Sequence, residues 1–155
     1  MTKPTTDFGQ VDIFQGDCKT YMVPSFARYA VSKYAMNLWT VELQRRLDES
    51  LKGAASHKIL VTSLHPGAVN TFAHYLPFSR FFHSLFSLFM TSPDDGASTS
   101  LFAAASPVVR AEAEKYGGQY MLPVGVLTSS KATRDTEMAA KLWNTTESFL
   151  QTLDI

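Results

Sequence analysis

Hydrophobic positions become periodic about 25 residues into the chain, where one falls on every third or fourth residue. This spacing places them on one face of an α-helix. It predicts a helix from Ser25 to about Leu51, which ends before Gly53. Residues 1–24 lack a sustained period, so an irregular leader is expected there. The predicted apolar face consists of Val31, Tyr34, Leu38 and Val41.

The pattern then changes from helical spacing to a short, continuous apolar run. Residues 59–64 are largely apolar and β-branched and stop before Pro66 and Gly67, which predicts a buried strand. A long helix, a short link and a buried strand form half of a parallel-sheet unit. The chain is therefore predicted to have an α/β fold.

Two more helices and a second strand are predicted downstream. The run from Ser92 to Asp95 supplies a capping serine, a proline at the first helical position and two acids in the first turn. This combination predicts a helix that continues to about Ala105. Gly117 and Gly118 predict a turn into a short strand, and residues 133–153 are predicted to be helical.

Composition excludes several classes of function. Acidic and basic residues are balanced at 14 each without a cluster of one sign, so no nucleic-acid partner is expected. The single cysteine, Cys18, permits neither an internal disulfide nor a zinc-thiolate cluster. The histidines lack ligand-like spacing, so no metal site is predicted. The N-terminus has no apolar core of a signal peptide, and a cytoplasmic location is expected.

Residues 76–90 form the most apolar stretch of the chain, but Arg80 and His83 interrupt it. It is too short and too polar to span a bilayer, so no transmembrane segment is predicted. Its aromatic residues also follow helical spacing beside these two basic side chains. A peripheral membrane contact through residues 76–90 therefore stays open as an alternative.

Tyr29 and Lys33 are the residues whose spacing best suits acid–base chemistry. Four residues apart on a helix, they lie on the same face, one turn from each other. A nearby ammonium favours the ionised form of a phenol, and a lysine has three donors for sugar hydroxyls. Chance alone gives roughly 0.3 such pairs in a chain of this composition. A solvated helix face is therefore a competing interpretation of the pair by itself.

The residues around this pair carry a family resemblance. The run Tyr29-Ala30-Val31-Ser32-Lys33, a long helix, and a strand that ends in His65-Pro66-Gly67 with Thr71 beyond it resemble the short-chain dehydrogenase/reductase family. The pattern of these sequence elements is most similar to that of retinol-dehydrogenase-like and fungal members. The resemblance covers the chain from about Arg28 onward, and its further elements are Ser92–Ala97, Gly118–Tyr120 and Leu142–Trp143.

The resemblance implies a fold and a set of roles. The fold is the C-terminal part of a Rossmann-type doubly wound parallel sheet with flanking helices, and residues 25–155 would be its catalytic and substrate-binding half. Tyr29 would be the acid or base of a carbonyl/alcohol interconversion, and Lys33 would hold the ribose of NAD or NADP. Pro66, Gly67 and Val69 would line the nicotinamide, and the Thr71 hydroxyl would lie near the carboxamide or the pyrophosphate.

The aromatic residues between positions 72 and 90 match the substrate lid of that family. They imply a small apolar or aromatic carbonyl or alcohol as the substrate. A long apolar loop without a helical or strand period is typically a functional segment, such as a lid over a binding site. The histidine of the strand end, His65, is expected to contribute structure rather than act as a base.

Several parts of the family pattern are missing from this sequence. No glycines have the spacing of the family's nucleotide loop, and the catalytic serine has no clear counterpart, although Thr5 and Thr6 lie in its vicinity. Without the first strands, residues 59–64 would lack a neighbouring strand and expose apolar surface. The chain is therefore expected to be a truncated half of an oxidoreductase, inactive by itself. The alternative is a non-catalytic module that pairs with an intact relative or with its own copy through the Tyr29 helix.

Overall fold

The computed structural model of the protein describes residues 7–9, 22–51, 59–69, 90–128 and 130–153, and all structural statements concern these ranges. Thr71, Cys18, Thr5, Thr6 and the aromatic-rich stretch 72–89 lie outside them. The helices are α2 (Pro24–Ser50), α4 (Pro93–Ala105), α5 (Pro107–Ala111), α6 (Ala113–Tyr116), the 3-10 helix η2 (Lys131–Arg134) and α7 (Thr136–Gln151). The strands are β1 (Ser63–Leu64), β2 (Tyr120–Leu122) and β3 (Val126–Leu127).

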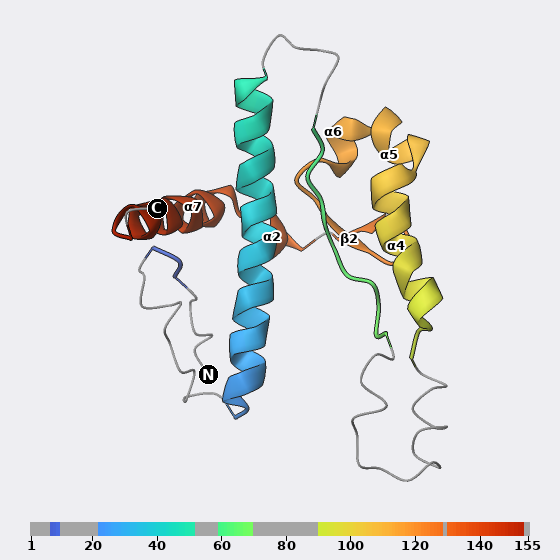
Figure 1. Ribbon diagram of the computed structural model, residues 1–155, viewed down its shortest axis with the longest axis horizontal. Coiled ribbons are helices and arrows are strands. Elements are labelled where there is room, and N and C mark those ends of the chain that lie inside the picture. Colours follow the sequence, from blue (N-terminus) through green and yellow to red (C-terminus); the bar gives the residue numbers. More distant parts are fainter. Residues whose placement is uncertain (1–6, 10–21, 52–58, 70–89, 129, 154–155) are drawn as a thin grey trace.

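The longest element, α2, confirms the helix predicted from Ser25 to about Leu51. It begins at Pro24, whose fixed φ suits the first helical position, without a side-chain cap on Val23. Figure 1 shows α2 in the middle of the molecule, with α7 on one side and the sheet on the other. The helix is thus the element that joins the two halves of the structure.

The sheet is small and mixed. β1 pairs in parallel with β2, and β2 pairs in antiparallel fashion with β3, so the order is β1-β2-β3. The register aligns Ser63 with Tyr120 and Leu64 with Met121. The helices and this sheet are compatible with the predicted α/β fold, and β1 and β2 form one parallel pair. The antiparallel β3 was not predicted, and the Rossmann-type doubly wound sheet stays a prediction.

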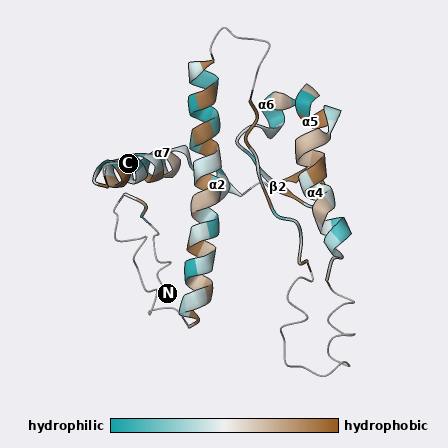
Figure 2. Ribbon diagram, in the orientation of Figure 1, coloured by the Kyte–Doolittle hydropathy of each residue, from teal (hydrophilic) through white to brown (hydrophobic). Residues whose placement is uncertain are grey.

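The strand predicted over residues 59–64 is shorter and less buried than expected. Only Ser63 and Leu64 are assigned to β1, both are half-buried, and Ile59 is exposed. Figure 2 shows the apolar character of this segment. The apolar run itself wrongly predicted a buried strand, because β1 is an edge strand of the described sheet and burial on both faces needs neighbours on both sides. The partial exposure agrees with the expectation for a sheet without its first strands.

Two apolar clusters hold the elements together. The first lies between α2 and α7 and contains Phe8, Leu38, Ala139 and Leu142, with Val31, Tyr34 and Val41 packed against it. It confirms the predicted apolar face of α2, and it includes Phe8 from the segment predicted as a leader. The second lies between the sheet and the helices α4 to α6 and contains Val109, Tyr116 and Met121.

Polar contacts reinforce the packing of α2 against α7. The indole rings of Trp39 and Trp143 stack at 4.1 Å, and the Arg46 guanidinium lies 4.6 Å from the centroid of the Trp143 ring. The Glu42 side chain is 1% exposed and accepts hydrogen bonds from Arg45 and Arg46. These hydrogen bonds lower the pKa of Glu42, with the bond from Arg45 as the largest cause.

The capping predictions at α4 are confirmed, and the C-terminal helix is shorter than predicted. The Ser92 hydroxyl accepts a hydrogen bond from the backbone N–H of Asp95 at 3.1 Å, and Pro93 occupies the first turn. The segment predicted as one helix over residues 133–153 divides into η2 and α7, with Asp135 as the cap of α7. Within the described residues, no helix is long and apolar enough to cross a membrane.

Candidate functional site

Tyr29 and Lys33 lie together in the first turns of α2. Their spacing of four residues brings the Lys33 ammonium to 5.5 Å from the centroid of the Tyr29 ring, a cation–π distance. Tyr29 is 58% exposed and Lys33 is exposed as well. The phenol and the ammonium are thus both accessible to a ligand.

Ser32 has a local role in the helix that carries this pair. Its hydroxyl donates a hydrogen bond to the backbone carbonyl of Tyr29 at 2.7 Å. A hydroxyl that bonds to the preceding turn is satisfied within the helix. The hydroxyl of Ser32 is therefore engaged with the backbone, and the phenol of Tyr29 and the ammonium of Lys33 are the exposed functional groups.

The second group of predicted residues lies at the carboxyl end of β1. Gly67 has a φ of +91°, a conformation that favours glycine. Its N–H donates a hydrogen bond to Nδ1 of His65 at 2.9 Å, so His65 helps to shape the turn. Pro66 and Ala68 are exposed at this point. In open α/β sheets, ligands bind at the carboxyl ends of the strands.

Val69 connects this turn to α4. It forms an isolated parallel bridge with Thr91, and the N–H of Thr91 donates to the carbonyl of Ala68 at 2.9 Å. A Cβ atom on Gly96 of α4 would lie 2.5 Å from Cγ2 of Val69, so only glycine allows this packing. Pro66, Gly67 and Val69 are therefore held as one unit by the start of α4, whereas Thr71 lies outside the described residues.

Tyr120 is a titratable residue of the sheet that sequence reasoning did not include in the site. It lies in β2, in register with Ser63 of β1. Burial raises the pKa of Tyr120, and the negative charge of an ionised Tyr29 raises it further. The positions of the two tyrosines in the sequence gave no indication of this electrostatic effect on Tyr120.

Gln44 fixes the distance between α2 and β1 and was also not predicted. Its side-chain amide donates to the carbonyl of Ile59 at 3.2 Å and accepts from the N–H of Val61 at 2.7 Å. The same amide donates to Asp48 at 3.0 Å. Since these backbone groups belong to alternate residues, the side chain pairs with the segment before β1 much as a strand would.

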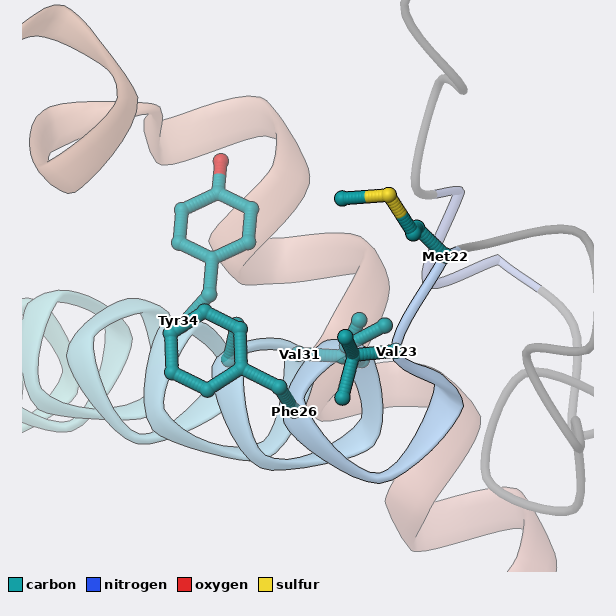
Figure 3. Close-up of a pocket in the computed structure, with 7 residues that line it drawn as sticks. Met22, Val23, Phe26, Val31 and Tyr34 are labelled. Atoms are coloured by element: carbon teal, nitrogen blue, oxygen red, sulfur yellow. The ribbon is translucent and has the colours of Figure 1, made fainter.

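An apolar groove adjoins the start of α2. Figure 3 shows side chains that line it, and its volume is about 500 Å³. Phe26 and Met22 are 68% and 98% exposed, so the groove opens directly to solvent. The ring of Phe26 also lies 6.4 Å from that of Tyr29. The groove is lined by Met22, Val23, Phe26, Ala27, Ala30, Val31 and Tyr34.

The described part of the chain holds no group of three side chains that could bind a metal ion. His65 is the histidine within that part, and His57, His74 and His83 lie outside it. Of the stretch 76–90, for which a peripheral membrane contact was left open as an alternative, residues 76–89 also lie outside it. The candidate site therefore consists of the Tyr29–Lys33 pair, Tyr120 and the turn from Pro66 to Val69.

Comparison with known proteins identifies relatives of this chain. A short-chain dehydrogenase/reductase of Armillaria gallica is 34% identical over 157 aligned positions, which cover 97% of this chain and 48% of the relative. A second one, of Macrophomina phaseolina, is 40% identical over 131 positions, which cover 83% of this chain and 61% of the relative. The human polyprenol dehydrogenase is 32% identical over 132 positions, 83% of this chain and 37% of that protein.

The extent of these matches is itself informative. The chain spans roughly half the length of the first two relatives, and a smaller share of the human one. No protein-family model matches the chain, and no solved structure matches it. The relationship therefore rests on sequence similarity along most of this chain to proteins that extend well beyond it.

Proposed function

Because its sequence places this chain in the short-chain dehydrogenase/reductase family, we propose that it carries the acid–base half of an NAD(P)-dependent oxidoreductase that interconverts a carbonyl compound and an alcohol. The observation that carries this proposal is the exposed Tyr29–Lys33 pair on α2, with the ammonium 5.5 Å from the phenol ring. The nucleotide-binding part would be supplied by a longer polypeptide, since this sequence has no glycine-rich loop.

Tyr29 would carry the proton in this reaction. In reduction its hydroxyl donates a proton to the carbonyl oxygen, and in oxidation the phenolate accepts the proton of the alcohol. Lys33 favours negative charge on the phenol oxygen, because an opposite charge nearby stabilises the ionised form. A bound nicotinamide would supply or accept the hydride. The substrate then leaves with one hydride and one proton gained or lost.

The residues at the end of β1 fit the nicotinamide end of such a cofactor. Pro66 and Ala68 are exposed there, and the positive φ of Gly67 turns the backbone away from the strand. Lys33 offers exposed donors that suit ribose hydroxyls. We assign Pro66, Gly67, Val69 and Thr71 to the nicotinamide and Tyr29 and Lys33 to the ribose side. The part of the family pattern that holds the pyrophosphate is missing from the sequence.

The proposed substrate is a small apolar or aromatic carbonyl compound or alcohol. The aromatic-rich segment 72–90 supports an apolar substrate. The human relative is named as a polyprenol dehydrogenase, which agrees with an apolar alcohol as one member of this class. A cytoplasmic location is proposed with it, because a single cysteine suits a reducing compartment.

The first experiment asks which polypeptide exists in the source cells. An antibody against residues 131–144 should detect a species about twice the 17.2 kDa of this chain. A single species of 17.2 kDa would contradict the proposal that a longer oxidoreductase contains these residues. The proposal also predicts that the purified 155-residue chain by itself shows no NAD(P)H-dependent reduction of carbonyl compounds.

The second experiment tests the role of Tyr29 in the longer form. Tyr29→Phe removes only the hydroxyl and should lower kcat at least a thousandfold, because the proton donor is lost. Tyr34→Phe is the matched control, since it makes the same change one or two turns along α2, on the side that packs against α7. It should retain most of the activity. Undiminished turnover in Tyr29→Phe would refute the assigned role.

A second candidate function is a non-catalytic module that pairs with an intact relative or with another copy of itself. The groove of about 500 Å³ at the start of α2 favours it, because large exposed apolar surface often marks an interface. Sedimentation of the purified chain, by itself and mixed with an intact relative, separates the two functions. If the chain sediments as a monomer and does not bind the relative, this second function is excluded. α7 already covers the face of α2 around Leu38, so that face is not open to such a partner.

A further inference from the structure

The backbone of β1 bonds to β2 along one edge only. The N–H groups of Ser63 and His65 donate to carbonyls of β2 and its preceding residue, at 3.1 and 2.8 Å. Alternate residues of an extended strand direct their backbone polar groups to opposite edges. The N–H and C=O groups of Leu60, Thr62 and Leu64 therefore point away from β2. No hydrogen bond joins them to another residue in the described part of the chain.

The same alternation continues upstream of β1. The amide of Gln44 bonds to the carbonyl of Ile59 and to the N–H of Val61, and the carbonyl of Val61 accepts the N–H of Gly118 at 2.9 Å. These groups lie on the edge that faces β2. Figure 1 shows the green segment that begins at residue 59 as a single extended stretch. The opposite edge is therefore open from residue 59 to residue 64, well beyond the two residues assigned to β1.

The residues of this open edge offer no protection against pairing. Natural proteins protect sheet edges with charged residues, prolines, bulges or a very short strand, and residues 59–64 contain no charged residue, proline or glycine. The other end of the sheet differs, because β3 has two residues and Arg134 donates to the carbonyl of Thr128 directly after it. Uncharged segments of about six residues with high β-propensity and no proline pair readily with copies of themselves.

The open edge is complementary to itself in antiparallel orientation. A two-fold axis through Thr62 places Leu60 opposite Leu64 of the second copy, so each outward N–H meets an outward carbonyl. Leu60 and Leu64 already pack against the cluster around Met121, and the pairing extends that apolar layer across the axis. Ile59, which is 54% exposed, gains a neighbouring strand that covers it.

We propose that the open edge of β1 binds a second copy of this chain, whose own residues 59–64 add as an antiparallel strand about a two-fold axis at Thr62. The two three-stranded sheets then form one continuous sheet. Such a contact uses the same surface on both copies and closes, so no open β1 edge is left for further copies. The proposal is independent of the roles assigned to Tyr29 and Lys33, and it uses a surface other than the groove at the start of α2.

The first test is amide hydrogen exchange of the complete 155-residue chain, observed by NMR at low and at high protein concentration. The amides of Leu60, Thr62 and Leu64 should exchange at least about tenfold more slowly at high concentration, because pairing gives them acceptors. The amides of Ser63 and His65 are the internal control, since they bond to β2 within one chain. Their exchange should change little with concentration.

The second test is sedimentation of variants at Thr62. Thr62→Pro removes an outward N–H, and proline is tolerated at the solvent side of an edge strand. This variant should sediment as a monomer of 17.2 kDa under conditions in which the wild type sediments at twice that mass. Thr62→Val is the matched control, because it keeps the N–H and the branched shape, and it should remain a dimer. If Thr62→Pro does not fold, the exchange measurement on the wild type decides.

Three results would overturn the proposal. The first is a wild-type chain that stays monomeric at high concentration. The second is a dimer in which the Thr62 amide exchanges as fast as at low concentration, because the copies then meet elsewhere, for example at the groove of α2. The third is a chain that is monomeric by itself but binds an intact relative, since the edge would then accept a strand of another sequence. None of these measurements needs turnover, so all remain valid if the oxidoreductase assignment fails.

Discussion

The indole rings of Trp39 and Trp143 stack with centroids 4.1 Å apart and planes inclined by 19°. They are the two tryptophans of the chain, and they join the helix of Tyr29 to the C-terminal helix. Arg46 lies over the Trp143 ring and donates to Glu42, so the aromatic pair and the buried carboxylate belong to one contact surface.

The stacked pair should contribute a measurable coupling energy. We expect Trp143→Leu and Trp39→Leu each to destabilise the protein, and their double-mutant cycle to give a coupling of about 1 kcal/mol, typical of aromatic pairs. Urea unfolding followed by circular dichroism measures it. Leu150→Ala, at an exposed position of α7, should change stability by less than about 0.5 kcal/mol. Additive effects of the two tryptophan changes would rule out a direct interaction.

Glu42 should make the protein sensitive to acid. Its pKa is held below the ordinary 4.5, first by the hydrogen bond from Arg45. The stability from this group is therefore fully present above pH 4.5 and is lost as the pH falls through the lowered pKa of the folded state. Glu42→Gln should cost about 2 kcal/mol at pH 7, since the partly exposed arginines lose a buried partner.

The measurement is the free energy of unfolding in urea between pH 3 and pH 7. In Glu42→Gln its decline toward low pH should be flatter than in the wild type. Glu137→Gln is a suitable control, because the Glu137 side chain is 82% exposed and pairs with the exposed Lys141 at 3.0 Å. If the free energy of unfolding declined equally with pH in the Glu42 variant and the wild type, the lowered pKa of Glu42 would not contribute to stability.

In Gly96→Ala, two opposing effects determine whether the protein becomes more or less stable. Alanine is favoured over glycine inside a helix by about 1 kcal/mol. The new Cβ, however, would lie 2.5 Å from Val69, and overpacking of this kind costs about 1–3 kcal/mol. We expect Gly96→Ala to destabilise the protein by about 1 kcal/mol net. In a Val69→Ala background the same change should be neutral or stabilising, and persistent destabilisation there would exclude Val69 as the cause.

Gln44 should control the order of the segment before β1. Gln44→Ala removes the acceptor of the Val61 N–H. The backbone amide of Val61 should therefore exchange with solvent at least about tenfold faster, which corresponds to a decrease of about 1.4 kcal/mol in the free energy of local opening. Hydrogen exchange observed by NMR measures it at single residues. Gln119→Ala is the control, because Gln119 contacts β1 through its backbone carbonyl. Equal exchange rates at the Val61 amide in wild type and variant would show that the Gln44 side chain does not order this segment.

Local features of the sequence predicted the helices well. The spacing of Val31, Tyr34 and Leu38 located α2 and its apolar face, and the cap at Ser92 located the start of α4. Both depend on residues within a few positions of each other. The apolar run of residues 59–64 overestimated the burial of β1, which depends on strands that pair from a distance. Only the missing family elements indicated that this segment would be partly exposed.

The candidate site was predictable only where a motif is contiguous. Tyr29 and Lys33 share a helix face by their spacing, and the structure places them together. The position of Tyr120 beside Ser63 depends on the register of β1 with β2, which pairs segments far apart in the sequence. Gln44 acts on backbone atoms, which no pattern of side chains reveals. The family roles of Pro66, Gly67, Val69 and Thr71 stay predictions.

The cluster between α2 and α7 also has a consequence for synthesis. Leu38 packs against Leu142, so the partner of this face leaves the ribosome roughly 100 residues later. At 5–20 residues per second, the apolar face of α2 waits about 5–20 s for its cover. During that time a chaperone or a neighbouring nascent chain has access to it, and a premature stop before α7 would leave the same surface open permanently.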